Sequence, residues 1–393
     1  MTEQPVVRFQ SPQMPSLDAV QQYFAVSMER RWFSNDGPCL RLLEDRLADF
    51  IGGGARCLGV SNATAALTVA LRHLVSEVHP ARALAVMPAY TFAATATAAN
   101  WSGLRPFLVD VDAESWQMDP DALEAVLDDR ADQIAVVVGC STFGTPPPPA
   151  VRERWRRACL AAGVPLLVDS AAGLGATDVG GGLPGPQGDV EVFSMHATKP
   201  FAIGEGGLLV TTTAERDSAL RRAVNFGFDG ARDLPGPPGT NAKMSELHAA
   251  MGLAVLDTYP GVLAARRATA DRMFARLEPL GFVRQGGAAG STVQFLSVLA
   301  PDDAARSAVL AQASAARVEL RAYYDVPLHR LTTYRGADRW GDLRTADALG
   351  RRALSLPMAN DLSEHDMNRV VSVCRDALQG RDDHGGRATH GED

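Results

Sequence analysis

The stretch "QIAVVVGCSTFGTPPPPAVRERWRRACLAAGVPLLVDS", residues 133–170, is the clearest indication of the fold class of this chain. It opens on an apolar run, passes through a proline-rich turn into a helical segment that ends at Gly163, and closes on a second apolar run before Asp169. Strands that are apolar along their whole length and alternate with helices are typical of a parallel sheet covered on both faces. The stretch therefore predicts a strand–helix–strand unit of an α/β protein.

The same alternation continues on both sides of this unit. Asp119 and Pro120 suit the cap and the first position of a helix over 119–129. Further helices are expected at 62–78, 91–101 and 149–163, and further strands at 56–61, 83–89, 105–111, 190–195 and 206–212. We therefore expect a mostly parallel sheet with helices on both faces.

After residue 213 the pattern changes to longer helical segments, at 244–260 and 261–280, followed by a strand at 291–300 and helices at 302–318 and 363–378. A chain of 393 residues exceeds one ordinary core, which favours two lobes. We expect a large domain over 1–261, which includes the N-terminal segment, and a smaller α+β domain over 262–378. The Gly-rich, charged end over 379–393 has little to bury and is predicted to be a disordered tail.

Composition excludes several classes of function. The net charge of -8 argues against nucleic acid or an anionic membrane as a partner, since both require a basic face. The five cysteines form no C-x-x-C pair, so neither a metal site nor a disulfide framework is expected, and a reduced, cytoplasmic compartment fits best. The polar N-terminus lacks the features of a signal peptide, and no apolar run is long enough to span a bilayer.

Lys199 stands in the small and apolar stretch "VFSMHATKPFAIGEGG", residues 192–207. Burying an ammonium group is costly, so a lysine in such a site has its pKa lowered and becomes a usable nucleophile. It can then form a Schiff base with an aldehyde. The alternative is a side chain that reaches along the surface to water. Ser194 and His196 lie in the same stretch, and Ser194 could donate to a phosphate.

Other chemistry-bearing residues follow neighbouring strands, and ligands of parallel sheets bind at the carboxyl ends of strands. Asp169 ends a buried strand and needs a cationic or donor partner, which is either a structural arginine or the protonated nitrogen of a pyridine ring. In "GVSNATAAL", the backbone N–H groups of Ala63 and Thr64 open a helix and suit an anion, although Asn62 is also an ordinary helix cap. Phe92 is either a core residue or a flat surface for a ring.

A Schiff-base lysine, an aspartate for the pyridine nitrogen, an aromatic face and an anion-binding turn together describe a site for pyridoxal phosphate (PLP). With these residues in place, the chain resembles the nucleotide-sugar aminotransferases of fold type I, the DegT family, from about residue 32 to 378. The stretches that carry the resemblance are "NDGPCLRLLEDRLADFIG", "SNATAALTVALR", "PAYTFAATATAANWSGLRPFLVDVD", "STFGTPPP", "VDSAAGLGA", "FSMHATKPFAIGEGG", "TNAKMSELHAAMGL", "YYDVPLH" and "RRALSLPM".

The resemblance assigns roles to single residues. It implies that Lys199 holds PLP covalently and then moves the proton, and that Asp169 pairs with the pyridine nitrogen. It implies that Phe92 stacks on the ring. Ala63, Thr64 and Ser194 would hold the phosphate, Asn241 would reach the phosphate of the neighbouring subunit's cofactor, and His329 and His196 would lie near the substrate.

The chain departs from the family pattern at Ala172, where a glutamine or histidine commonly stands near the phenolic oxygen of the cofactor. That contact is either missing or supplied by another residue such as His196. The departure puts a simple transfer of substrate preference in doubt.

The resemblance implies a PLP-dependent aminotransferase that moves an amino group from glutamate (or glutamine) to a nucleotide-linked keto-sugar, with pyridoxamine phosphate formed between the two half-reactions. An NDP-4-keto-6-deoxyhexose is the first expectation, in amino-sugar biosynthesis for an antibiotic, another secondary metabolite or a surface glycan. A cytoplasmic homodimer with shared active sites is expected, with no nucleic acid and no membrane as partner.

Four alternatives stay open or are weighed against the sequence. The ketone could be a 3-keto-sugar or a cyclitol, and a non-catalytic regulator could keep the fold. A sugar dehydratase of the same fold would replace Lys199 with histidine, so transamination is favoured. A dinucleotide-dependent dehydrogenase would need a G-x-G-x-x-G turn, which "GVSNAT" is not.

Overall fold

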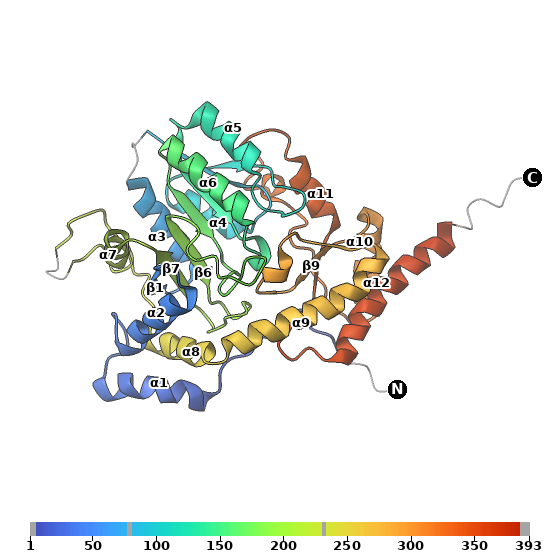
Figure 1. The fold of residues 1–393 in the computed structure, drawn as a ribbon, viewed down its shortest axis with the longest axis horizontal. Coiled ribbons are helices and arrows are strands. Elements are labelled where there is room, and N and C mark those ends of the chain that lie inside the picture. The colour runs from blue at the N-terminus through green and yellow to red at the C-terminus, as the bar shows by residue number, and fades with distance from the viewer. Residues whose placement is uncertain (1–4, 77–80, 230–232, 386–393) are drawn as a thin grey trace, which may run out of the picture.

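The structure is a computed structural model that describes residues 5–76, 81–229 and 233–385. Within these residues, eight strands form a large sheet and three form a small one (Figure 1). The large sheet contains β1 (Arg56–Val60), β2 (Leu84–Pro88), β3 (Arg105–Val109), β4 (Ile134–Cys140), β5 (Leu166–Asp169), β6 (Val190–Ser194), β7 (Gly207–Thr211) and β10 (Asp338–Arg339), and the small sheet contains β8 (Val283–Arg284), β9 (Leu296–Leu299) and β11 (Ala353–Leu356).

The helices alternate with the strands in the first half of the chain and dominate the second half. They are α1 (Leu17–Arg30), α2 (Pro38–Ile51), α3 (Ala63–Ser76), α4 (Ala93–Trp101), α5 (Pro120–Arg130), α6 (Pro149–Ala162), α7 (Ala214–Ala223), α8 (Glu246–Leu256), α9 (Tyr259–Leu277), α10 (Asp303–Ala315), α11 (Arg344–Arg352) and α12 (Glu364–Gly385).

The large sheet is mostly parallel, which confirms the predicted fold class. Its strand order is β1-β7-β6-β5-β4-β2-β3-β10, and β7 pairs antiparallel with both of its neighbours. The pairs within β6-β5-β4-β2-β3 are all parallel, with one register shift between β2 and β4 at Leu84 and Ala85. Consequently the carboxyl ends of β2, β4, β5 and β6 meet along one edge of the sheet.

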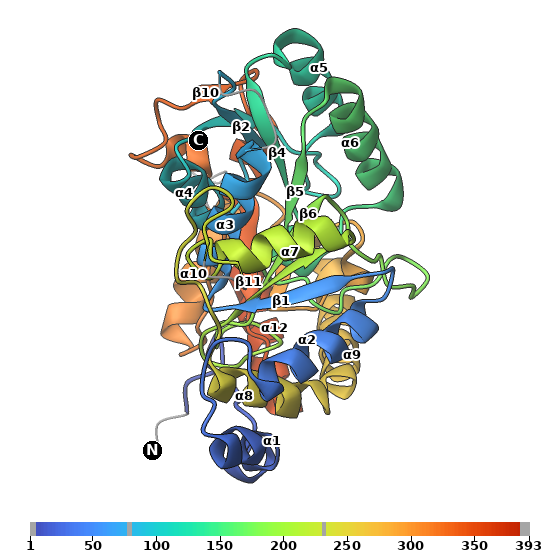
Figure 2. The same ribbon diagram turned by 90° about the vertical axis from the view of Figure 1, so that its left-hand side faces the viewer.

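Helices cover both faces of the large sheet. On one face, Leu123 of α5 and Trp155 of α6 pack against Val137 of β4 in one apolar cluster. On the other face, helices α3 and α4 pack against Val138 in a second cluster. Figure 2 shows the two helix pairs on opposite sides of the sheet. Because every residue of β4 is buried, its continuous apolar run reflects contact on both faces.

Local signals set the ends of several helices. The side chain of Asp119 caps α5 by accepting a hydrogen bond from the N–H of Asp121, and Pro120 takes the first helical position, as predicted. Helix α6 ends at Gly163, whose φ of 60° is the left-handed conformation that glycine adopts without strain. These caps fix where the chain turns back toward the sheet.

The small sheet has the order β11-β9-β8 and packs with α10 and α12 in the same apolar cluster that covers one face of the large sheet. The N-terminal segment joins this region, because Val7 forms a bridge to Val318 and the carbonyl of Phe9 accepts from Met358 N–H. Strand β10 lies within residues 262–378 but pairs with β3, so the predicted smaller domain contributes a short edge strand to the large sheet.

Two predicted elements differ from the structure. The strand expected at 291–300 is only β9, Leu296–Leu299, since Val293 takes a positive φ of 55° that no strand accommodates. Helix α12 continues to Gly385, so residues 379–385 are helical rather than irregular, and the rest of the predicted disordered tail lies outside the described residues. Within the described chain, no single helix is long and apolar enough to cross a membrane; a pair bent by 60°, Glu246–Leu256 and Tyr259–Leu280, passes that test only when taken together.

Candidate active site

A cavity of about 610 Å³ opens at the carboxyl ends of the parallel strands. Loops after β2, β4, β5 and β6 supply one side of its wall, and Gln294, Phe295, Tyr323 and Tyr324 supply the other. The cavity brings together most of the residues predicted for the site, namely Ala63, Thr64, Phe92, Asp169, Ser194, His196 and Lys199.

Lys199 lies in the loop between β6 and β7, five residues after the end of β6 at Ser194. The loop is fixed by backbone hydrogen bonds from Ala197 N–H to Gly204 O and from Lys199 N–H to His196 O. Burial lowers the pKa of the Lys199 amine to about 8, against the opposing effect of the Asp169 charge. A substantial part of the amine is therefore neutral near physiological pH, as a nucleophile or base requires.

Asp169 ends β5 and is only 8% exposed. Its Oδ2 accepts a hydrogen bond of 2.7 Å from the Thr95 hydroxyl, and its Oδ1 accepts one of 3.2 Å from Ala171 N–H. Burial raises the pKa of Asp169, while these two donors and the charge of Lys199 act in the opposite direction. Among the ion pairs of the described residues none includes Asp169, so its charge faces the cavity without a cation in contact.

The first turn of α3 offers unused hydrogen-bond donors. The N–H of Ala65 donates to Asn62 Oδ1, but in the described chain no hydrogen bond uses the N–H of Ala63 or Thr64. Gly207 of β7 lies against this turn, and only a glycine fits at that position. A Cβ on residue 207 would lie 2.6 Å from the Asn62 carbonyl carbon and 2.7 Å from Ala63 N. Two free N–H groups at a helix N-terminus bind an anionic oxygen well.

Aromatic side chains form the rim and one wall of the cavity. Phe92 lines the cavity and is 60% exposed, so its ring is available to a ligand. Tyr90 is instead fully buried, with its hydroxyl donating to Tyr323 O and accepting from Tyr324 N–H. The ring of Tyr324 stacks on that of Phe143 at 5.0 Å. Tyr90 is therefore a core residue, whereas Phe92 faces the cavity.

Two predicted site residues are not brought to this cavity. His329 is 3% exposed, its Nε2 pairs with Asp347 Oδ1 of α11 at 2.9 Å, and it is not among the residues that line the cavity. Asn241 is exposed and forms a bridge with Asn225 away from the cavity. His196 does line the cavity, with its Nδ1 2.9 Å from Thr198 Oγ1.

Other residues of the site carry no local signal in the sequence. Thr95 holds Asp169, and Gln294 accepts a hydrogen bond of 3.2 Å from the Lys199 amine. Gln10 and Tyr324 also line the cavity. Gln10, Gln294 and Tyr324 join the site from distant parts of the chain, whereas Thr95 follows Phe92 closely. Two of the four lie in quoted motifs, Thr95 in "PAYTFAAT" and Tyr324 in "YYDVPLH".

This donor set fits pyridoxal phosphate. A buried amine of lowered pKa suits its aldehyde, an uncompensated buried carboxylate suits a protonated pyridine nitrogen, and free N–H groups at a helix start suit its phosphate. These three requirements are met within a single cavity of sufficient size.

Comparison with known proteins gives one consistent result. The model of the DegT/DnrJ/EryC1/StrS aminotransferase family matches residues 17–375. Mycobacterium tuberculosis protein Rv3402c is 31% identical over 95% of this chain and 90% of its own length. The dTDP-4-amino-4,6-dideoxy-D-glucose transaminase of Shigella dysenteriae is 27% identical over 93% and 97%, respectively. The crystal structure of DesI in the presence of its TDP-sugar product has a TM-score of 0.86, with 31% identity over 98% of this chain and 96% of that one.

Proposed function

Because the chain belongs to the DegT/DnrJ/EryC1/StrS aminotransferase family, and so is a PLP-dependent aminotransferase, we propose that it transfers an amino group from glutamate or glutamine to a nucleotide-linked 4-keto-6-deoxyhexose. The observation that carries this proposal is that one cavity is lined by both the Lys199 amine, whose pKa is lowered, and the buried carboxylate of Asp169. The cofactor and the type of enzyme follow from the family, whereas the substrate and donor are proposed.

The residues of the chain divide the work of the reaction. Bound pyridoxal phosphate would supply an electron-withdrawing ring, which makes a proton on the neighbouring carbon easier to remove. Asp169, which is oriented by hydrogen bonds from Thr95 and Ala171, would stabilise the protonated form of the pyridine nitrogen. Lys199, with its pKa lowered to about 8, takes and returns the proton. The start of α3 holds the phosphate in place.

The names of two relatives support the sugar class. One relative is named for a dTDP-4-amino-4,6-dideoxy-D-glucose, and the other was crystallised with a TDP-sugar product. The first name specifies nitrogen at C-4 and a deoxygenated C-6. The segment "RWFSNDGP", residues 31–38, which leads into α2, resembles the corresponding segment of family members that aminate C-4 more than that of members that aminate C-3. We therefore place the amination at C-4, in amino-sugar biosynthesis for a secondary metabolite or a surface glycan.

The proposal includes a homodimer in which each chain completes the other's site. Asn241 is exposed and away from its own cavity, which suits a role toward the neighbouring chain's cofactor. Apolar side chains nearby in the fold are also partly exposed, among them Phe33 on the loop before α2 and Leu247 on α8. Exposed apolar side chains that gather around one segment are a feature of protein interfaces.

A cytoplasmic site of action is also proposed. All five cysteines are free and buried, as expected of a chain that works in a reducing compartment.

The proposal is tested by incubating the purified enzyme with glutamate or glutamine and a panel of ketones. The panel holds a dTDP-4-keto-6-deoxyhexose, a 3-keto isomer and a cyclitol ketone. We expect the 2-oxo acid of the donor and a new amino sugar from the 4-keto compound. Product only from the 3-keto sugar or the cyclitol would replace the proposed substrate, and no 2-oxo acid with any acceptor would favour a non-catalytic role.

A further inference from the structure

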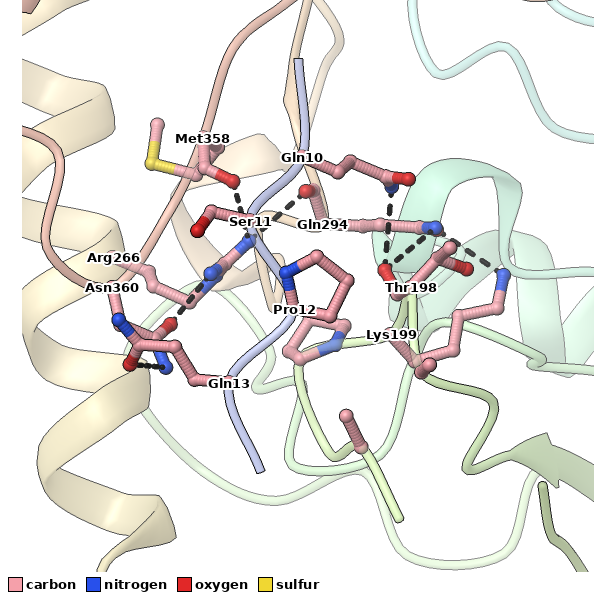
Figure 3. Close-up of a pocket in the computed structure, with 13 residues that line it drawn as sticks. Gln10, Ser11, Pro12, Gln13, Thr198, Lys199, Arg266, Gln294, Met358 and Asn360 are labelled. Atoms are coloured by element: carbon pink, nitrogen blue, oxygen red, sulfur yellow. Dashed lines mark hydrogen bonds between the residues drawn. The ribbon is translucent and has the colours of Figure 1, made fainter. Parts of the chain in front are cut away.

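Gln294 is the residue that contacts the reactive amine. Its Oε1 accepts a hydrogen bond of 3.2 Å from Lys199 Nζ, and the glutamine is only 7% exposed. Figure 3 shows the side chains of Gln294 and Gln10 converging on Thr198, beside Lys199. No residue role assigned so far explains why a nearly buried amide should face this amine.

The direction of the Gln294 amide is fixed by its second contact. Its Nε2 donates to the carbonyl oxygen of Thr198 at 3.2 Å. A carbonyl accepts but cannot donate, so turning the amide over would set two oxygens against each other and leave an N–H group facing the ammonium. Gln294 therefore presents an acceptor, and not a donor, to Lys199.

The backbone around Gln294 is held by a buried charge. Arg266 of α9 donates from Nε to Val293 O at 2.9 Å and from Nη2 to Gln294 O at 3.0 Å, and its Nη1 donates to Asn360 Oδ1 at 2.6 Å. Arg266 is 7% exposed, and the ion pairs of the described residues give it no carboxylate partner. Burying a guanidinium that has only carbonyl oxygens as partners costs free energy. This cost indicates that the fold requires the backbone geometry that Arg266 holds at Val293 and Gln294.

Val293 adds a second sign of enforced geometry. Its φ of 55° lies in the left-handed region, which a β-branched residue rarely occupies. Such strain persists where the surroundings over-determine the backbone, and it gathers at functional sites. The strained residue Val293 lies one position before Gln294, and its carbonyl oxygen accepts the hydrogen bond from Arg266 Nε.

The N-terminal segment closes this arrangement from outside. Gln10 Nε2 donates to the same Thr198 carbonyl at 3.3 Å, and Asn360 Nδ2 donates to Gln13 Oε1 at 3.2 Å. The Thr198 carbonyl thus receives donors from two separate segments. These two hydrogen bonds, from Gln10 and Gln294, restrain the backbone next to Lys199.

We propose that Gln294 is a positioning residue that receives the amine of Lys199 whenever it is not bonded to the cofactor, and keeps it aimed into the cavity. Arg266 braces Gln294 for this purpose. The proposal rests on the proposed function, since it assumes that Lys199 alternates between a free amine and a bond to PLP. It predicts that Gln294 stabilises the charged form of the free amine, because an acceptor bonds an ammonium more strongly than a neutral amine.

Other ionisable groups that line the cavity are Cys140, Asp169, His196, Glu205, Tyr323 and Tyr324. They remain unchanged in the variants used below, so a difference between variants reports on position 294.

The test measures covalent capture of pyridoxal phosphate by cofactor-free enzyme, trapped by borohydride and located by mass spectrometry, as a function of pH. The chain has only one other lysine, Lys243, so assignment of the trapped site is simple. Wild-type capture at Lys199 should rise with a midpoint near pH 8. We expect Gln294→Leu to lower the midpoint by about half a pH unit and Gln294→Glu to raise it by about one unit.

Gln285→Leu is the matched control. Gln285 is also nearly buried and bonded at both amide atoms, to Thr145 and Ser115, but it does not line the cavity. Its midpoint should equal that of the wild type even if the protein is less stable. Capture by the wild type with identical midpoints in both Gln294 variants would overturn the proposal alone. No capture at Lys199 at any pH would overturn the proposed function as well.

Discussion

Thr95 and Asp169 are joined by a hydrogen bond of 2.7 Å from the threonine hydroxyl to Oδ2 of the aspartate. The bond links the first turn of α4 to the end of β5, two segments that are 74 residues apart. Burial raises the pKa of Asp169. Because a hydrogen-bond donor favours the ionised form of a carboxylate, Thr95 offsets part of this increase in pKa. The charge needed by a pyridine nitrogen thus depends on a residue from another helix.

Thr95→Val should weaken retention of the cofactor. The substitution keeps the shape of the side chain but removes a hydrogen bond to a charged group, which contributes about 1.5 kcal/mol, or roughly tenfold in affinity. The dissociation constant for pyridoxal phosphate, measured by absorbance titration of cofactor-free enzyme, should rise accordingly. Thr97→Val, on the same helix but bonded to Tyr334, should leave it unchanged. Equal affinities in the wild type and Thr95→Val would contradict this role.

Lys199→Ala should abolish the covalent attachment of the cofactor and transamination with it. The wild type should show a visible absorbance band that borohydride removes, and the variant should not, because the described residues that line the cavity include no other lysine. Lys243→Ala is the matched variant, since Lys243 is bonded to Asn225 and lies outside the cavity. A colourless wild type whose spectrum pyridoxal phosphate does not change would rule out the cofactor assignment.

The stability of cofactor-free enzyme should depend on pH through Lys199. Burial lowers the pKa of its amine from 10.5 to about 8 in the folded state, so the unfolded chain binds more protons between these values. Stability relative to Lys199→Met should therefore rise as the pH increases from 8 to 10, by an amount on the order of 2 kcal/mol. Urea unfolding of both proteins at pH 7 and pH 10 measures the difference. A constant difference would show that the amine is not desolvated.

Gly207→Ala should impair binding of the phosphate while leaving the fold intact. A methyl group there meets the backbone of Asn62 and Ala63 at under 3.0 Å, so the first turn of α3 must shift. We expect at least a tenfold loss of affinity for pyridoxal phosphate, which corresponds to about 1.4 kcal/mol. Gly261→Ala, in a helix with open space around it, is the control and should bind normally. Comparable affinity in both variants would argue against this turn as the phosphate site.

Glu246→Ala should destabilise the fold without touching the cavity. The buried carboxylate of Glu246 accepts from Ser27 Oγ at 2.7 Å and from the N–H groups of Cys39 and Leu40 at 2.7 and 3.0 Å, which open α2. Its removal leaves these donors unsatisfied, at a cost of about 3 kcal/mol. The urea midpoint should fall, whereas Glu215→Ala at an exposed first turn of α7 should change it little. Similar midpoints would show that water replaces the carboxylate.

The sequence was informative where a signal is local. Lys199 is conspicuous as a lysine in a small and apolar stretch, Asp169 as a charge at the end of an apolar strand, and strand–helix alternation predicts the mostly parallel sheet. Caps such as Asp119 and Gly163 also marked helix ends closely.

Contacts between distant segments were not accessible in this way. Thr95 and Gln294 are ordinary residues in sequence, and only the fold brings them to Asp169 and Lys199. The motif around His329 predicts a place near the substrate, and sequence alone gives no sign of the contact that its side chain makes with Asp347. The strand expected at 291–300 is shortened because Arg266, on another helix, holds Val293 in a conformation that a strand excludes.

The bond from Gln10 to the Thr198 carbonyl has a practical consequence for engineering this enzyme. The segment before α1 is bridged at Val7 and anchored at Phe9, so it forms part of the active-site wall and is unsuited to trimming. Shortened versions that begin at α1 would lose a wall residue together with a contact to the lysine loop. Affinity tags and fused partners are therefore better joined after α12, whose end points away from the large sheet (Figure 1).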